Sequence, residues 1–322
     1  MAANETKKDL VRVAVTQLEP EWLDLQGTVA KTCRYIAEAA RNGAQIIAFP
    51  EVFIPGYPTW IWSRPVDPDL SVKYIRNSLR INSPEMKSIQ DCARDNGIIV
   101  CLGFSENDNH SLYISQSLIN AEGEIVYTRR KVKPTHVERT TFGDGNGDSL
   151  KNVADTHIGR VGSLACWEHL QPLLKFNTFS QREEFHIAAW PAIFPHTGSE
   201  LWSLSEEGCR TMAQTYAMES QTFVLHTTTV LTQKGIDLMQ GGPLLFGSPG
   251  GGNSAVFGPD GRKLTEDLPP LEEGLLYADL DKSMIMASRC FADACGHYSR
   301  PDLLSLTINN KVKMVVNSLG SE

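Results

Sequence analysis

The chain has 322 residues, of which 41% are hydrophobic and 21% are charged, the balance of an ordinary globular protein. A formal net charge of -8 argues against a nucleic-acid partner, because proteins that bind nucleic acids usually present a basic face. No apolar run reaches the roughly 18–20 residues that a membrane-spanning helix needs, so no membrane association is predicted.

Apolar patterning predicts strands and helices that alternate along the chain. Helix 27–43 ends at Asn42-Gly43, and helix 83–97 opens with Ser83-Pro84 and closes on Asn96-Gly97. In chain order we expect strand 11–17, helix 27–43, strand 44–51, helix 83–97, strand 98–106, a hairpin over 111–132 that turns at Glu122-Gly123, strands 160–168 and 186–191, a helix over much of 200–219, strand 222–230, and a hairpin over 253–264 that turns at Asp260-Gly261. Strands mixed with covering helices predict a layered α/β domain.

The pattern indicates one domain over residues 9–316, between a flexible lead-in (1–8) and a flexible tail (317–322), because no long linker or repeat divides the chain. Residues 1–8 lack the apolar segment of a secretory signal. The seven scattered cysteines contain no CxxC pair, which favours a reducing, cytoplasmic setting over disulfides or structural zinc. Neither a metal nor a cofactor is expected. The histidines lack paired ligand spacing, and the glycine-rich segment 246–254 lacks the ending of a phosphate loop.

Chemically capable side chains stand at three points where predicted strands end. Glu51 closes one apolar run, Lys131 and Lys133 end the first hairpin, and Cys166 ends a third run. From the residues alone, Glu51 is either a surface cap or a desolvated base, and the lysines are either solvated or catalytic. Cys166 is a buried core thiol, a metal ligand or a nucleophile. Loops at strand ends assemble the sites of α/β folds, so a base, a cation and a thiol there form a plausible nucleophilic set.

The sequence around these residues resembles the three signature motifs of the nitrilase superfamily, in the same order and with similar separations. The matching segments are "FPEVFIPGYP" around Glu51, "RRKVKPTHVER" around Lys131 and "ACWEHLQP" around Cys166. The segment "CGHYSRPDLLSL" (295–306) resembles the C-terminal motif of nitrilases, so the likeness covers nearly the whole chain. Cys-Trp-Glu and "GHYSRPD" are similar to true nitrilases, in particular to fungal and bacterial arylacetonitrilases and aliphatic nitrilases.

The resemblance implies a role for each of four residues. By their positions in the motifs, Cys166 is the nucleophile, Glu51 the general base, Lys131 the cation that stabilises the tetrahedral intermediate, and Glu138 a second acid in the site. Since relatives place methionine at the second lysine position, Lys131 is preferred over Lys133. The backbone N–H of Trp167 is expected to join Lys131 in stabilising negative charge.

Aromatic residues near these motifs are expected to bind substrate, with plain core packing as the alternative for each. They are Tyr57, Trp60, Trp167 and Trp190. His136 and His169 are further candidates for supporting positions, without an assigned role.

The implied fold is a four-layer α-β-β-α sandwich that dimerises to an eight-layer α-β-β-α-α-β-β-α assembly. The implied activity is hydrolysis of an arylacetonitrile or aliphatic nitrile to the carboxylic acid and ammonia, through a thioimidate and a thioester. The alternatives are a cyanide hydratase that releases formamide, an amidase or carbamoylase, and a non-catalytic scaffold. Cyanide hydratases resemble "CWENMNP" after the cysteine, whereas this chain reads "CWEHLQP". The small-molecule nitrile is the expected partner, and the short stretch after "GHYSRPD" favours a homo-oligomer no larger than a dimer or short assembly.

Overall fold

The computed structural model describes residues 10–242 and 245–316. The lead-in and tail that the sequence predicts, 1–8 and 317–322, lie outside the described residues. Eleven strands of the described chain form two half-sheets. The first contains β1 (Leu10–Leu18), β2 (Ile46–Ala48), β3 (Ile99–Asp108), β4 (Ser111–Ile119), β5 (Ile125–Arg130) and β11 (Gly274–Asp281). The second contains β6 (Val153–Thr156), β7 (Gly159–Ala165), β8 (Phe185–Ala189), β9 (Phe223–Thr229) and β10 (Ala255–Phe257).

The two half-sheets meet at the end of β1. That strand pairs in parallel with β2 and antiparallel with β11. It reaches β9 of the second half-sheet only through Gln17 and Leu18, which pair in parallel with Thr228 and Thr229. The strand order β5-β4-β3-β2-β1-β9-β8-β7-β6 is therefore continuous, although its two halves pack face to face.

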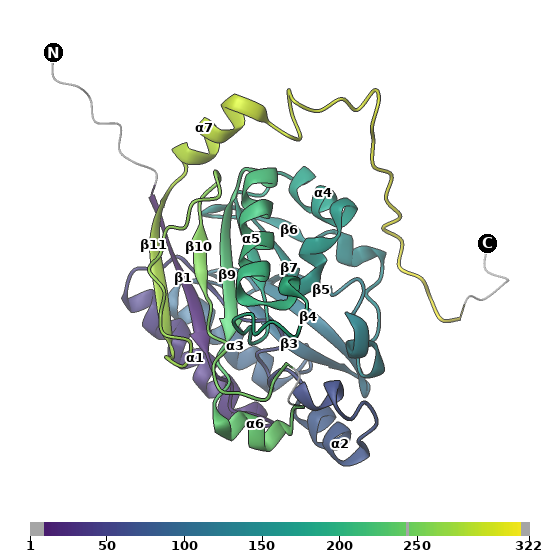
Figure 1. The fold of residues 1–322 in the computed structure, drawn as a ribbon. Coiled ribbons are helices and arrows are strands. Elements are labelled where there is room, and N and C mark those ends of the chain that lie inside the picture. Colours follow the sequence, from purple (N-terminus) through teal and green to yellow (C-terminus); the bar gives the residue numbers. More distant parts are fainter. Residues whose placement is uncertain (1–9, 243–244, 317–322) are drawn as a thin grey trace.

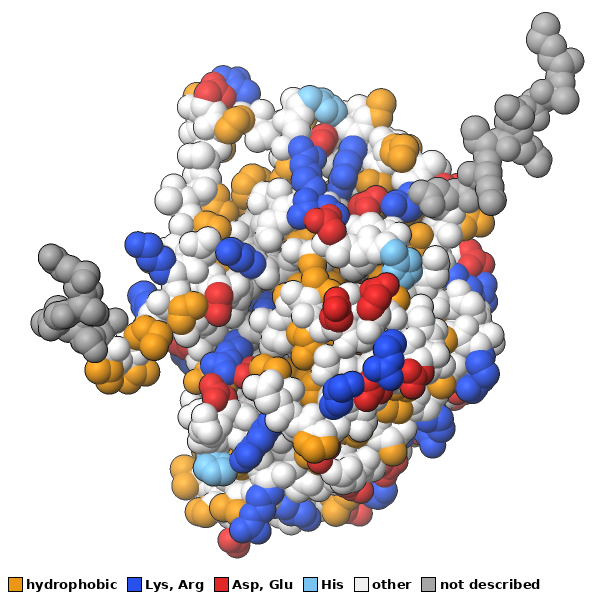
Figure 2. Space-filling view, turned by 180° about the vertical axis from the view of Figure 1, so that it is seen from behind, with side chains coloured by type: hydrophobic (Ala, Val, Ile, Leu, Met, Phe, Trp, Pro, Cys, Tyr) orange, Lys and Arg blue, Asp and Glu red, His pale blue; other side chains and the backbone are white. Residues whose placement is uncertain are grey.

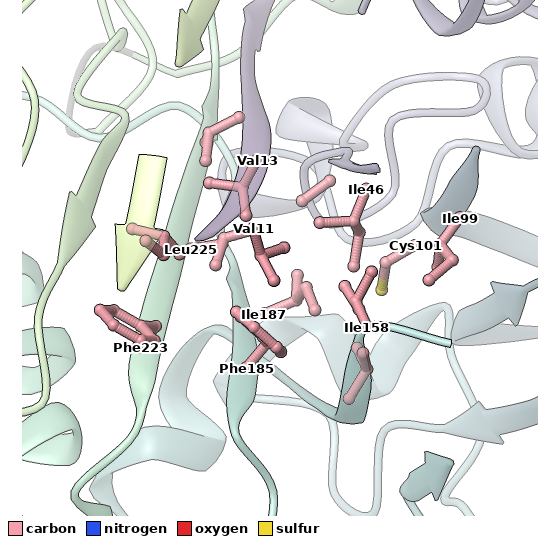
Figure 3. Close-up of a cluster of buried hydrophobic side chains, with 14 of the residues drawn as sticks. Val11, Val13, Ile46, Ile99, Cys101, Ile158, Phe185, Ile187, Phe223 and Leu225 are labelled. Carbon is pink, nitrogen blue, oxygen red and sulfur yellow. The ribbon is translucent and has the colours of Figure 1, made fainter. Parts of the chain in front are cut away.

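The core between the half-sheets is made of alternate strand residues. Val11 and Val13 of β1 point into the same apolar cluster as Phe185 and Ile187 of β8 and Phe223 of β9, and Figure 3 shows them converging. The intervening residues of β1 face the other way, as the two-residue period of a strand requires. Both half-sheets therefore bury one face against each other and the opposite face beneath helices.

Helices cover the two outer faces (Figure 1). α1 (Leu25–Arg41) and α3 (Pro84–Asn96) pack on the first half-sheet, while α4 (Pro172–Ser180) and α5 (Glu206–Ser220) pack on the second. The layers follow the order helix, sheet, sheet, helix. The predicted four-layer α/β sandwich is confirmed.

The helix boundaries follow the local chemistry of their ends. Asp24 accepts a hydrogen bond from the N–H of Gly27 to begin α1, and Ser83 accepts one from Met86 to begin α3. Gly97, with φ of 60°, ends α3 as the sequence predicts. The helix expected within 200–219 begins only at Glu206, because Ser205 is its N-cap and a 3₁₀ turn over Trp202–Leu204 precedes it.

Several predicted elements need correction. The strand expected over 44–51 pairs only at Ile46–Ala48, because the following residues leave the sheet toward a loop. The hairpin expected over 253–264 does turn at Asp260-Gly261, but its second arm is too short to count as a strand, and it pairs with β10 through one antiparallel bridge between Phe257 and Lys263. The sequence interpretation also missed elements that the structure contains: α2 (Pro68–Asn77), α4, α6 (Gln233–Met239), α7 (Ser283–Ala292), β6 as a separate strand, and β11.

The C-terminal segment runs away from the sandwich. After α7 the chain extends along one side of the molecule without regular structure (Figure 1). Figure 2, seen from behind, shows hydrophobic side chains beside the grey C-terminal atoms, while acidic and basic side chains intermingle over the rest of this face. None of the helices within the described residues is both long and apolar enough to span a bilayer.

Candidate active site

Glu51 lies in a loop that is pressed onto the first half-sheet. It follows β2 by three residues, and the N–H of Phe53 donates to the carbonyl of Gly103 at 2.9 Å. A Cβ at Gly103 would lie 2.0 Å from the carbonyl oxygen of Pro50, so only glycine allows this close approach. Val52 adopts φ of 50°, a strained value for a β-branched residue. The Glu51 side chain is fully buried as a result.

Lys131 leaves the first half-sheet immediately after β5. Its Nζ lies 2.9 Å from Oε1 of Glu51 and 2.8 Å from Oε2 of Glu138, with all three side chains buried. Lys133 behaves differently, because its side chain is 51% exposed and pairs with Asp144 at 2.7 Å. The structure therefore brings Lys131 into the candidate site and places Lys133 on the surface.

The two carboxylates on Lys131 differ in how many hydrogen bonds they accept. Glu138 stands in a 3₁₀ turn over His136–Thr140, and its Oε2 also accepts the N–H of Thr135 at 2.6 Å. Its Oε1 accepts the hydroxyl of Tyr57 at 2.8 Å. Within the described residues, the buried Oε2 of Glu51 has no hydrogen-bond partner. Glu51 thus keeps a free lone pair, whereas both oxygens of Glu138 are occupied.

Cys166 comes from the second half-sheet, directly after β7, and opens a 3₁₀ turn over Cys166–Leu170. Its φ of 50° lies in the left-handed region, which is costly for a residue with a side chain. Strained backbone of this kind collects at functional sites, and Val52 and His136 (φ 47°) show it in the loops of Glu51 and Glu138.

A buried ion pair holds the loops of Lys131 and Cys166 together. Oε1 of Glu168 accepts from Nη2 of Arg129 at 2.6 Å and from the N–H of Val132 at 2.8 Å. Its Oε2 accepts the N–H of Ala165 at 2.9 Å. One carboxylate therefore joins the residue after Lys131 to the residue before Cys166.

Burial and charge set the proton affinities of the site. Desolvation raises the pKa of Glu51 to about 7, against the opposing effect of the Lys131 charge. Desolvation disfavours the charged form of Lys131, but Glu138 and Glu51 outweigh it and raise its pKa well above the usual value. Burial and then the Glu51 charge raise the pKa of the Cys166 thiol well above its usual value. At neutral pH the site therefore contains an ammonium, a thiol and a base able to accept the thiol proton.

A pocket of about 470 Å³ opens onto Cys166 and Glu138. Tyr57, Trp167 and Trp190 line it, as the sequence predicts. Trp60 does not, because it is buried with its ring 5.1 Å from that of Tyr74 in a T-shaped contact. The expectation that Trp60 binds substrate is corrected: its place is in the core.

Sequence reasoning missed part of the pocket wall. Trp62 lies there, stacked on His136 with ring centres 5.6 Å apart, and its indole N–H donates to the Tyr57 hydroxyl at 3.2 Å. Phe194 and Phe246 lie there as well. The repeated tryptophan of "TWIW" was a usable signal for Trp62. Phe246 belongs to the glycine-rich segment, whose only evident signal was flexibility.

The described residues contain no cluster of three or more His, Cys, Asp or Glu side chains suited to a metal ion. The candidate site itself offers two carboxylates, and both are already paired with the Lys131 ammonium.

Comparison with known proteins shows what this arrangement is similar to. Residues 12–289 match the family described as carbon-nitrogen hydrolase. An arylacetonitrilase from Aspergillus kawachii is 61% identical over 305 residues, covering 94% of this chain and 93% of that protein. An arylacetonitrilase from Hypocrea virens is 57% identical, covering 97% of this chain and 96% of its own length.

Solved structures give a further comparison. A mutant of an amidase from Nesterenkonia sp. AN1, with an acetamide moiety covalently added at its active-site cysteine, matches this chain with a TM-score of 0.65 at 20% sequence identity. The match covers 91% of this chain and 95% of that one. At that identity the match concerns the fold.

Proposed function

Because the chain belongs to the carbon-nitrogen hydrolase family, we propose that it is a nitrilase that hydrolyses an arylacetonitrile, or a related organic nitrile, to the carboxylic acid and ammonia. One observation carries the proposal: Lys131 is bound by two buried carboxylates, of which only Glu51 keeps a free oxygen, in a site that contains the Cys166 thiol. The curated relatives named arylacetonitrilase support the choice of substrate.

The first stage forms a covalent bond to the nitrile carbon. Because the pKa of the Cys166 thiol is raised, the thiol is not ionised beforehand, and its proton passes to Glu51 as sulfur attacks. The C≡N bond loses one π bond, and negative charge builds on nitrogen. Lys131 and the N–H of Trp167 stabilise that charge, and the proton held by Glu51 completes the thioimidate.

The second stage releases ammonia and then the acid. Water adds to the thioimidate carbon, giving a tetrahedral carbon that bears sulfur, hydroxyl and amine. Expulsion of the amine as ammonia leaves a thioester, and a second water hydrolyses it to the carboxylic acid and the free thiol. Glu138 keeps Lys131 charged throughout, since it accepts a hydrogen bond from Nζ at 2.8 Å. If the tetrahedral carbon expels sulfur instead, the product is the amide.

The shape of the pocket supports an aromatic substrate. Five aromatic side chains beside Tyr57 face the space above Cys166: Trp62, Trp167, Trp190, Phe194 and Phe246. An aryl ring is well matched to such walls, because stacked and edge-on ring contacts add to the burial of apolar area. A volume of about 470 Å³ exceeds what hydrogen cyanide needs and lies in the usual range for organic ligands.

The alternatives share the same residues and are separated by substrate. The purified protein is incubated with phenylacetonitrile, cyanide or phenylacetamide, and ammonia, amide and acid are measured. We expect phenylacetonitrile to give mainly phenylacetic acid and ammonia, and Cys166→Ala to give none while keeping a native circular dichroism spectrum. Formamide from cyanide as the main activity, or turnover of phenylacetamide alone, would replace the proposal with a cyanide hydratase or an amidase.

Two further proposals concern the setting of the enzyme. All seven cysteines are free thiols in the structure, which suits the cytoplasm. We also propose a homo-oligomer, starting from an eight-layer dimer, because hydrophobic side chains of α7 and of the C-terminal segment are exposed. They include Phe291, Tyr298, Leu303 and Leu304.

A further inference from the structure

A chain of four buried polar side chains runs beneath the catalytic turn. Nδ1 of His169 lies 2.7 Å from the carbonyl oxygen of Cys166. Its Nε2 lies 2.9 Å from Nε2 of His186, whose Nδ1 lies 2.9 Å from Oε2 of Glu183. Tyr216 donates its hydroxyl to the other oxygen of Glu183. All four side chains are at most 1% exposed, so bulk water does not reach these bonds.

The proton positions in this chain follow from its two ends. A carbonyl oxygen only accepts, so Nδ1 of His169 must carry a proton. Burial and the neighbouring His186 hold the pKa of His169 well below its usual value, so its ring is neutral and Nε2 accepts. His186 must then donate from Nε2. Its Nδ1 and the facing Glu183 oxygen share one more proton, because two bare acceptors would repel each other.

The chain therefore holds one proton more than two neutral histidines and a carboxylate would. That proton fixes the tautomer of His186, with its other proton on Nε2. The Nε2 proton of His186 in turn fixes the tautomer of His169, so that Nδ1 of His169 stays a donor to the Cys166 carbonyl. Ring contacts hold the same geometry: His169 stacks on Trp190 at 5.4 Å, and His186 stacks on Tyr216 at 3.9 Å.

The Cys166 carbonyl matters because of the peptide that it belongs to. In a planar trans peptide the C=O and the following N–H point in opposite directions. Holding the Cys166 oxygen toward His169 in the core therefore aims the Trp167 N–H away from the core, where Cys166 and Trp167 line the pocket. The left-handed φ of Cys166 makes this orientation costly without an anchor.

We propose that His169, His186, Glu183 and Tyr216 form a positioning relay that orients the Cys166–Trp167 peptide, so that the Trp167 N–H stabilises the anion of the reaction. These are positioning residues, because none of them touches the reacting atoms. The proposal rests on Cys166 being the nucleophile, as the proposed function states.

The first test compares two replacements of His169. His169→Phe keeps a ring against Trp190 but has no donor, whereas His169→Asn places an amide N–H where Nδ1 stood and loses the contact with His186. Removing an oriented anion donor lowers kcat about 10²–10³-fold. We expect His169→Phe to show such a loss with KM nearly unchanged, and His169→Asn to recover at least about tenfold of it.

Alkylation of Cys166 by iodoacetamide separates positioning of the donor from general damage. In that reaction sulfur displaces iodide and no anion forms on the electrophile's oxygen or nitrogen, so the Trp167 N–H contributes nothing. His169→Phe should therefore be alkylated at Cys166, identified by peptide mass, within about twofold of the wild-type rate. An equal slowing of alkylation and hydrolysis would overturn the proposal, as would an unchanged kcat.

The relay itself is tested at its far end by two replacements of Glu183. In Glu183→Gln the amide NH2 donates to Nδ1 of His186 and the amide oxygen accepts the Tyr216 hydroxyl, as a protonated Glu183 would, so kcat should stay near the wild-type value. Glu183→Leu leaves Nδ1 of His186 without a partner and no longer holds its ring against His169. We expect kcat of Glu183→Leu to fall in the wild-type background and to stay unchanged by the same substitution in His169→Asn, a double-mutant cycle. Equal losses in both backgrounds would show that Glu183 acts only on stability.

A matched control is His226→Phe. His226 is a buried ring 5.8 Å from Trp190, and burial lowers its pKa to about 3. Wild-type kcat is expected for it. If Glu183→Leu fails to fold, the two His169 variants decide alone. If the wild type hydrolyses amides instead of nitriles, the proposed function fails. The relay can still be tested, because the double-mutant cycle is then measured with the amide as substrate, and negative charge develops on the amide carbonyl oxygen at the same place.

Discussion

Two glutamates that contact the same ammonium have different surroundings, which suits them to the different tasks that we propose. Glu138 accepts hydrogen bonds from Thr135, Tyr57 and Lys131, and these contacts stabilise its charge. Glu51 receives one such bond and is otherwise surrounded by buried groups. The environment, and not the residue type, therefore favours Glu51 over Glu138 as the base that we propose.

The pH dependence of the rate should report the protonation of Glu51. Glu51 must be ionised to take the thiol proton, and desolvation places its pKa at about 7. We expect kcat/KM to rise with pH through an acid limb near 7 and to be low below it. Because the Glu138 charge raises the pKa of Glu51, the residual activity of Glu138→Gln should show this limb at lower pH. A limb unmoved by this substitution would contradict the coupling.

The two lysines of "RRKVK" should differ sharply in their contribution to the rate. Lys131→Ala removes a buried cation that faces the developing anion, a loss of about 3–4 kcal/mol, or several hundredfold in kcat. Lys131→Arg should also lose most of the activity, since the planar guanidinium group does not fit where the compact lysine ammonium lies. Lys133→Met, on the exposed side chain, is the control and should keep most of the activity. Steady-state rates with circular dichroism check this, and the reverse order would exchange the two roles.

Strand alternation could not separate these lysines, because residues two apart share a face in a regular strand. In the structure, β5 ends at Arg130, so Lys131 and Lys133 do not lie in a regular strand, and their side chains point in different directions. What did point to Lys131 was the resemblance of its surrounding motif.

At the level of elements, the loops after β5 and β7 depend on one ion pair. Arg129 and Glu168 are both fully buried, and Arg129 also donates to the side chain of Gln116 at 2.8 Å. Burial by itself would raise the pKa of Glu168, but the charge and the hydrogen bond of Arg129 outweigh burial and lower it. Removing one partner leaves an uncompensated charge in the core.

Glu168→Gln should lower the free energy of unfolding by about 3–5 kcal/mol, because it leaves Arg129 buried without a counter-charge. The matched control is Asp279→Asn, which removes an exposed partner of Arg12 and should cost less than about 1 kcal/mol. Urea denaturation of both variants measures the difference. Equal midpoints would show that the buried pair contributes no more than a surface pair.

The strand ends that carry Glu51, Lys131 and Cys166 were accessible from sequence, because apolar runs and motifs mark them. The supporting residues were not. His186 and Glu183 meet His169 only through tertiary packing of β8 beside β7, and no local pattern relates them. The same holds for Phe246, which reaches the pocket from a segment whose composition indicates only a loop.

At the scale of the whole molecule, the exposed apolar side chains after α7 suggest a surface that another copy covers. Leu303 and Leu304 are 68% and 83% exposed, which is unfavourable for leucines in water. The eight-layer dimer and any longer assembly remain predictions.

Light scattering should find a dimer or a short assembly, and the double substitution Leu303→Ser and Leu304→Ser should reduce the mean mass, because it removes apolar area that association would bury. Val66→Ser, at an 85% exposed site that precedes α2, serves as the control and should leave the mass unchanged. Megadalton particles would refute the oligomer size that we predict. An unchanged mean mass in the double leucine variant would show that this surface is not the oligomer interface.

The activity of the enzyme depends on how the two half-sheets are aligned where they meet, at the end of β1. Glu51 and Lys131 follow strands of one half-sheet and Cys166 follows a strand of the other. Within the described residues, strand pairing joins the two halves only at Gln17 and Leu18. A slight sliding of one half over the other would separate thiol from base while leaving every helix intact. The catalytic rate is therefore sensitive to the relative position of the two half-sheets. In rising urea we expect catalytic activity to disappear before the far-UV ellipticity changes. Coincident loss of both signals would mean that the halves part only when the whole domain unfolds.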